Sequence, residues 1–133
     1  MNHDWYDRPN YDGDRKNWQD WNNNQITFDR IDSHRIEIYT TILDAFSNNI
    51  VFYLDEDSNS FTLTDLGETY QNIQENTSFN NDPQDIIAKI SAKYQVKFKR
   101  NILEMTDISL TELGPKIRDF GQMILEITLL STN

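Results

Sequence analysis

The sequence predicts an α+β fold: a small antiparallel sheet of two hairpin-like units with about three helices, the last of them a C-terminal amphipathic helix. Apolar residues alternate with the period of a strand in two separate parts of the chain, and they recur with helical spacing between and after those parts. The 133 residues suffice for one domain with a real core and are too few for two comfortable ones. We therefore expect a single domain with an N-terminal arm.

The first hairpin-like unit begins with RIEIYTTIL at residues 35–43. Its isoleucines and one threonine share a face with period two, although several of its residues also fit a helical stripe, so periodicity alone leaves the choice open. We choose a strand, because β-branched and aromatic residues dominate and Ser-Asn-Asn at 47–49 supplies a turn. Residues 50–54 and 61–64 then predict a second and a third strand.

A helix is predicted from Thr64 or Asp65 to about residue 74, although Gly67 lies unusually early in it. Pro83 is suited to the first position of a second helix, which should end near residue 94.

The second hairpin-like unit is VKFKR followed by ILEMT, with its turn at residues 100–101. Gly114 and Pro115 are expected to open the last helix, in which apolar residues keep helical spacing. A helix this apolar either packs deep or dimerises, and a homodimer through it stays open.

Residues 1–25 differ from the single α+β domain predicted at 26–133, because they combine aromatic residues with Asn, Asp and Arg and contain no Ile, Leu or Val. Such a segment cannot bury a core of its own. One interpretation is a mobile arm or a short helix that folds back onto the domain. The other is a recognition arm, since Trp, Tyr and Arg often anchor interfaces. The candidate anchors are Trp5, Tyr6, Tyr11, Trp18 and Trp21.

The chain is strongly acidic, with 22 Asp and Glu against 12 Lys and Arg and a net charge of −10. Direct binding to nucleic acid or to an anionic membrane is therefore not expected, and a protein partner with a basic surface is favoured. Lys93, Lys97, Lys99 and Arg100 form one basic patch, which we interpret as a solvated face. With no cysteine and no signal-peptide pattern, we expect a cytoplasmic protein.

Residues 34–130 resemble a family of small domains from Gram-positive bacteria and their phages, the domain of unknown function 1828. The resemblance lies in EIYTTILDAFSNNIVFYL, FTLTDLGETYQNI, DIIAKISAKYQVKFKRNILEM and KIRDFGQMILEITLL. Leu63, Thr64, Asp65 and Gly67 match its helix-entry motif, while Leu66 stands where members commonly carry a second Asp. The resemblance implies an α+β fold and a mobile-element context, but no established activity.

The most site-like stretch is YLDEDSNSFTLTDLGETY, residues 53–70. Asp55, Asp57 and Asn59 have the spacing of the first three ligands of a calcium loop, but Ser60 replaces the glycine of the sharp turn and Leu66 the closing glutamate. We therefore expect no metal site and no cofactor, and we interpret the stretch as a solvated acidic hairpin tip.

Catalysis is not expected either. Asp65 and Glu68 fit a helix cap and a dipole partner better than an acid/base pair, and only two histidines are present.

The resulting hypothesis is a non-enzymatic acidic protein-interaction module, in particular a phage- or prophage-type accessory inhibitor. It would occupy a basic nucleic-acid-binding site on a host protein and so mimic DNA, as members of the anti-CRISPR or anti-restriction class would. Its contacts would be the aromatic arm and the hairpin tip with Asp55, Glu56 and Asp57. The alternative is a regulatory or nuclease-associated domain with Asp55, Asp57 and Asp65 as metal ligands.

Overall fold

A computed structural model describes residues 26–77 and 83–132 of the chain. Six strands and three helices follow in the order β1 (Ile26–Arg30), β2 (Arg35–Leu43), β3 (Asn49–Glu56), β4 (Phe61–Thr64), α2 (Glu68–Asn76), α3 (Gln84–Lys93), β5 (Lys97–Lys99), β6 (Ile102–Ile108) and α4 (Leu110–Ser131). The predicted α+β class is therefore confirmed, as is the choice of strand over helix for β2.

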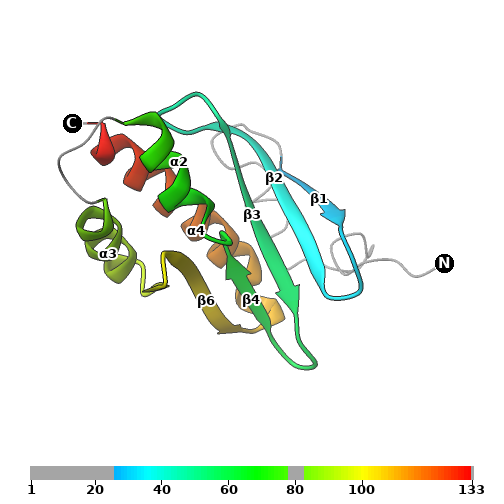
Figure 1. The fold of residues 1–133 in the computed structure, drawn as a ribbon. Coiled ribbons are helices and arrows are strands. Elements are labelled where there is room, and N and C mark those ends of the chain that lie inside the picture. Colours follow the sequence, from blue (N-terminus) through cyan, green and yellow to red (C-terminus); the bar gives the residue numbers. More distant parts are fainter. Residues whose placement is uncertain (1–25, 78–82, 133) are drawn as a thin grey trace.

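The strands form one antiparallel sheet in the order β1-β2-β3-β4-β6-β5 (Figure 1). The first four are consecutive in the chain, and the β5–β6 hairpin joins them through the pairing of β6 with β4. The predicted antiparallel sheet is confirmed, and β1 adds to it a strand that was not predicted. Only Ile26 of its five residues is buried, so β1 shows too little apolar alternation to be recognised.

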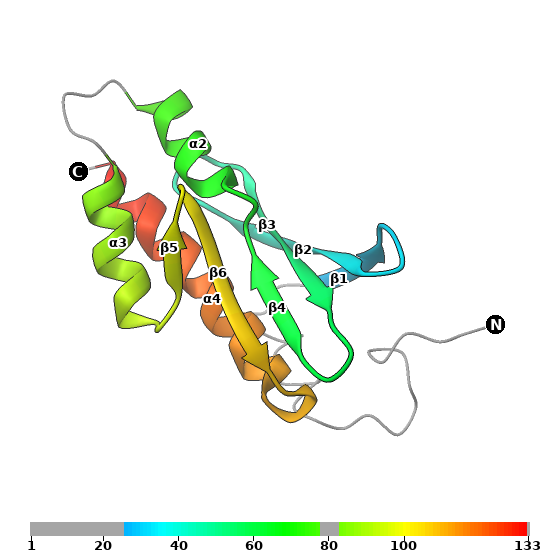
Figure 2. The ribbon, with the colours of Figure 1, turned by 60° about the horizontal axis from the view of Figure 1, so that its bottom comes forward.

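The described helices cover one face of this sheet (Figure 2). The long helix α4 lies along the middle of that face and contacts β3, β4 and β6. At its C-terminal end α4 also contacts α3, which lies beside β5, and α2, which lies at the end of the sheet. On the other face, the outward side chains of β2 are exposed or half-buried.

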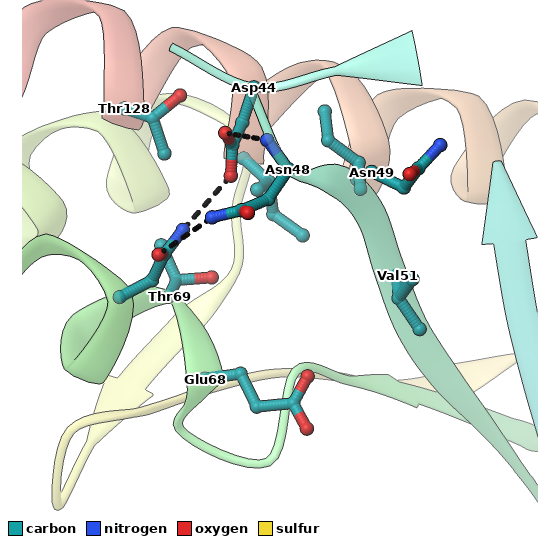
Figure 3. A pocket seen from close by; sticks show the side chains of 10 residues that line it. Asp44, Asn48, Asn49, Val51, Glu68, Thr69 and Thr128 are labelled. Carbon is teal, nitrogen blue, oxygen red and sulfur yellow. Dashed lines mark hydrogen bonds between the residues drawn. The ribbon is translucent and has the colours of Figure 1, made fainter. Parts of the chain in front are cut away.

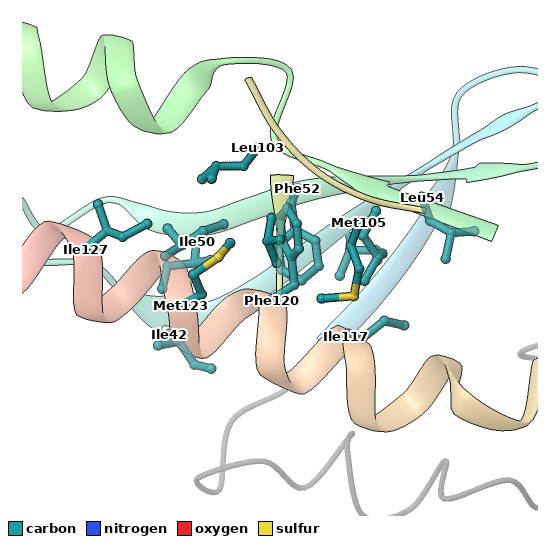
Figure 4. Close-up of a cluster of buried hydrophobic side chains, with 14 of the residues drawn as sticks. Ile42, Ile50, Phe52, Leu54, Leu103, Met105, Ile117, Phe120, Met123 and Ile127 are labelled. Carbon is teal, nitrogen blue, oxygen red and sulfur yellow. The ribbon is translucent and has the colours of Figure 1, made fainter. Parts of the chain in front are cut away.

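The hydrophobic core lies between the sheet and α4 (Figure 4). Its centre is the contact between Phe52 of β3 and Phe120 of α4, both fully buried, with ring centroids 5.0 Å apart. Strands contribute every second residue and α4 every third or fourth, as the two periodicities require. The other fully buried large side chains are Ile36, Ile38, Ile50, Leu54, Leu63, Ile73, Ile87, Leu103 and Leu113.

The turn of the β5–β6 hairpin lies where it was predicted. Arg100 and Asn101 have φ of 55° and 65°, the left-handed pair of a tight hairpin turn. Lys97 and Lys99 are exposed while Val96 is buried, which confirms the expected solvated basic face at this edge.

Helix α4 begins earlier than predicted, at Leu110 instead of Gly114. Ser109 and Glu112 form a capping box, in which the Glu112 carboxylate accepts the backbone N–H of Ser109 at 3.2 Å and its hydroxyl at 2.8 Å. Pro115 therefore lies inside the helix, in its second turn. The glycine and proline pair was given too much weight as a start signal.

Helix α2 begins later than predicted, at Glu68, because Leu66 and Gly67 both have positive φ, of 55° and 82°. Gly67 therefore precedes the helix, and a Cβ there would come within 3.4 Å of the Asn101 carbonyl oxygen. The left-handed backbone favours glycine at this position. None of the described helices has the length and apolar character needed to cross a membrane.

Candidate partner-binding surface

Acidic and tyrosine side chains gather on the outer face of strands β1–β3. In the register of the sheet Asp29 lies directly opposite Glu37, and Glu37 lies opposite Tyr53 on its other side. Tyr39, two residues along β2 from Glu37, is 40% exposed. Glu68 completes the set, because its Oε2 accepts a hydrogen bond from the Tyr53 hydroxyl at 3.1 Å. We call these five residues the acidic–tyrosine patch.

Two groups of the patch, Tyr53 and Glu68, have raised pKa values, mainly because they are partly buried. Partial burial, together with the neighbouring carboxylates of Glu68 and Glu37, raises the pKa of Tyr53 to about 12. Burial is also the main cause that raises the pKa of Glu68, assisted by the charges of Asp65 and Glu37 and opposed by the Tyr53 hydrogen bond.

The pairing of Asp29 with Glu37 costs stability, because like charges directly opposite one another in an antiparallel pair repel. The nearest cation along the outer face of β2 is Arg35, and its guanidinium is bound to Asp55. The patch is thus an arrangement that a positively charged group from outside would stabilise.

A polar pocket of about 210 Å³ adjoins the patch, with Glu68 and Val51 in its lining (Figure 3). It lies where the β2–β3 turn meets α2 and the end of α4. Three asparagines, two threonines and two carboxylates lie in its lining. The complete lining is Asp44, Asn48, Asn49, Ile50, Val51, Glu68, Thr69, Asn72, Ile124 and Thr128.

Both carboxylate oxygens of Asp44 accept hydrogen bonds from residues in and beside this pocket. One of its oxygens accepts the backbone N–H of Phe46 at 2.8 Å and of Asn48 at 3.0 Å, and the other accepts the Asn72 amide at 2.9 Å. The Asn48 amide donates to Asn72 at 3.1 Å (Figure 3). Asp44 therefore joins the β2–β3 turn to α2, and Glu68 is the pocket carboxylate that faces the patch.

The hairpin tip is less available than the sequence predicted. Arg35 binds Asp55 through two hydrogen bonds, of 2.6 Å from Nε and 2.9 Å from Nη2. Arg30 binds Glu56 at 2.8 Å. Only Asp57 of the three predicted partner-binding carboxylates is exposed, so the interpretation of the whole tip as solvated was wrong for Asp55 and Glu56.

The carboxylate of Asp65 is buried, at 1% exposure, and serves the fold. Its Oδ1 accepts the backbone N–H groups of Gly67 at 2.8 Å and Leu103 at 2.9 Å, and its Oδ2 accepts that of Thr69 at 3.1 Å. Asp65 thus accepts a backbone N–H from the first turn of α2 and also ties that helix to β6, whereas the N-cap position itself is Gly67 and not the predicted Thr64 or Asp65. Within residues 26–77 and 83–132, no three His, Asp or Glu side chains are grouped so that they would hold a metal ion.

Of the predicted contact residues, Trp5, Tyr6, Tyr11, Trp18 and Trp21 lie outside the described part of the chain. The structure instead draws attention to the patch, which sequence reasoning missed. The signal was present in RIEIY, where Glu37 and Tyr39 alternate with the buried isoleucines. Their meeting with Asp29, Tyr53 and Glu68 depends on the strand register.

Comparison of the chain with individual known proteins gives no match, whereas comparison with family models gives one. Neither the curated proteins nor the solved structures contain a match to the chain. The model of a family described as a domain of unknown function, DUF1828, matches residues 40–127. The match runs from β2 through most of α4 and therefore spans most of the described fold, so this chain belongs to the DUF1828 family.

Proposed function

We propose that this protein is a non-enzymatic acidic interaction module that binds a basic surface of a protein partner through the acidic–tyrosine patch. The observation that supports this proposal best is the pairing of Asp29 with Glu37 beside exposed Tyr39, on a sheet face that the described helices leave uncovered. Carboxylates attract Lys and Arg, and tyrosine rings offer flat area on which a cation packs.

The net charge of −10 supports the same proposal at longer range. An acidic protein is steered toward a basic partner, which speeds association and makes it sensitive to salt. A specific form of the proposal is a phage- or prophage-type accessory inhibitor that occupies a basic nucleic-acid-binding site of a host protein, as an anti-CRISPR or anti-restriction protein would. A cytoplasmic location suits such a role.

The tryptophans of the N-terminal arm stay predicted as a second contact. Three indoles in a segment with few aliphatic neighbours are poorly explained by core packing alone. In this proposal the patch supplies charge and the arm supplies apolar anchors.

The test is affinity capture from host lysate with the full chain, followed by binding measurements on the purified captured partner. In the patch variant, Glu37→Gln is combined with Tyr39→Ala. In the matched control, Glu75→Gln on α2 is combined with Tyr70→Ala on the same helix, which removes one charge and one ring elsewhere. Loss of a true anchor should weaken binding by about 2 kcal/mol or more.

The patch variant should therefore lose most of its affinity while the control keeps it, and added nucleic acid should compete with binding. A partner that binds both variants equally, at any salt concentration, would contradict the proposed surface. Competition by nucleic acid tests the inhibitor form separately, because a basic partner without a nucleic-acid site would bind the patch and be insensitive to it.

A further inference from the structure

A second surface lies on the opposite side of the molecule from the uncovered sheet face, between α3 and α4. There the two helices leave a groove with a volume of about 470 Å³. Its floor is apolar, formed by Ile86 and Ile90 of α3 and by Leu130 of α4. Exposed apolar surface rimmed by charged side chains is typical of interaction sites.

The end of α4 carries two exposed leucines. Leu129 and Leu130 are 50% and 45% exposed, although α4 is otherwise the most deeply packed helix of the fold. Leu130 lines the groove, whereas Leu129 lies on the outer crest of the helix, one turn after Glu126. The same surface therefore carries an exposed apolar side chain next to an apolar groove.

We infer that a second copy of this chain docks on this surface, each copy inserting Leu129 into the α3–α4 groove of the other. A two-fold interface requires a surface that is complementary to itself, so that a residue of one copy contacts a second residue and receives the reciprocal contact. An exposed leucine beside a groove satisfies that requirement. This inference does not depend on the proposed function.

The charge of the groove fits the same occupant. Two copies with a net charge of −10 repel each other over most of their surfaces. Helix α3 differs from the rest of the chain in its charge, because it carries Lys89 and Lys93 and a single acidic residue, Asp85. Lys93 binds Glu126 across the groove at 2.7 Å, and Lys89 is exposed on the α3 wall.

In the docked arrangement Glu126 of the second copy accompanies its Leu129 and approaches the lysine-bearing wall of α3. The contact thus joins the least acidic side of one copy to a carboxylate of the other.

The experiment is sedimentation velocity of the full chain over a concentration series, with Leu129→Glu as the variant that removes the inserted side chain and Lys89→Glu as the variant that reverses the wall. Leu43→Glu on the outer sheet face is the matched control, because Leu43 is 52% exposed, close to Leu129. Circular dichroism and thermal melting verify that each variant is folded.

The wild type should sediment as a species of twice the 15.8 kDa chain mass. Leu129→Glu should raise the dissociation constant roughly 100-fold, since the contact is lost twice at roughly tenfold each. Lys89→Glu should weaken the dimer less, and Leu43→Glu should leave it unchanged.

Three results would overturn the inference. The first is a wild type that stays monomeric up to about 100 μM, which would mean that the two copies do not associate measurably through this surface. The second is a dimer that both groove variants leave intact. The third is a dimer that Leu43→Glu dissociates as readily as Leu129→Glu does, because the contact would then lie elsewhere.

Discussion

Replacing Asp65 tests the fold at the junction between α2 and β6. Its carboxylate accepts three backbone N–H groups, from Gly67, Thr69 and Leu103, at 2.8, 3.1 and 2.9 Å. The backbone N–H groups of Thr69 and Leu103 are buried, so water cannot replace the carboxylate as their acceptor when the side chain is removed. The side chain itself is 1% exposed.

The expected loss follows from these contacts. A buried donor left without a partner costs about 1–3 kcal/mol, so two of them make Asp65→Ala destabilising by about 4 kcal/mol. Asp65→Asn keeps one acceptor oxygen. The other oxygen is replaced by an amide group, which is a donor and would face a backbone N–H that is also a donor. The cost of Asp65→Asn should be about 2 kcal/mol. Losses of this size are a large share of the stability of a small domain.

The assay is equilibrium unfolding in urea followed by circular dichroism. Asp57→Asn is the matched control, because Asp57 is exposed at the tip of the β3–β4 hairpin, and it should change the free energy of unfolding by about 0.5 kcal/mol or less. If Asp65→Asn were as harmless as Asp57→Asn, the carboxylate would not be holding α2 to β6, and the reasoning from these three hydrogen bonds would be refuted.

Three further predictions concern other contacts. Glu68→Gln should become more stable relative to wild type as pH rises from 4.5 to neutral. The reason is that the raised pKa of Glu68 makes the native wild type bind more protons than its unfolded state in that window, so the wild type loses stability as these protons are released. Melting temperatures measured across pH test this prediction. Arg35→Lys should cost about 1 kcal/mol in urea unfolding, since lysine cannot reproduce the two hydrogen bonds to Asp55. Ser109→Ala should also cost about 1 kcal/mol through loss of the α4 capping box, with helix content read by circular dichroism.

Controls and contrary outcomes differ among the three. For Glu68→Gln, melting temperatures that stay parallel to those of the wild type across this pH range would exclude the raised pKa of Glu68. Arg100→Lys lies at an exposed turn and should be neutral. Equal losses of unfolding free energy in Arg35→Lys and Arg100→Lys would show that the two hydrogen bonds from Arg35 to Asp55 do not stabilise the fold. For Ser109→Ala, the control is Ser58→Ala at the hairpin tip, and a neutral effect at both would mean that α4 does not depend on its cap.

The sequence predicted the parts of the fold that rest on local pattern. Strand β2 was recognised because its buried side chains alternate without interruption, and the β5–β6 hairpin because Arg100 and Asn101 separate two alternating runs. Strand β1 was missed since it has one buried residue, and an edge strand needs only one partner to be stabilised. The start of α4 was misplaced because it was predicted from Gly114 and Pro115, and the capping box of Ser109 and Glu112 was overlooked.

The candidate surface was less predictable, for a physical reason. Glu37 and Tyr39 are visible as outward residues of one strand, but the patch exists only because the register brings Asp29 and Tyr53 beside them. The ion pair of Arg35 with Asp55 has the same origin, since these residues lie opposite each other in β2 and β3. Spacing along one segment indicates which face a side chain occupies and says little about its neighbours across the sheet.

The pairing of β4 with β6 has a consequence for how the chain folds. Strands β1–β4 are joined by three successive short turns, so each pairing closes a short loop. In contrast, Leu63 of β4 pairs with Met105 of β6 only after α2, α3 and β5 have intervened. The entropy lost in closing so long a loop makes this the slowest pairing to form. Because α4 packs against strands on both sides of that junction, its docking and the completion of the sheet belong to the same late step.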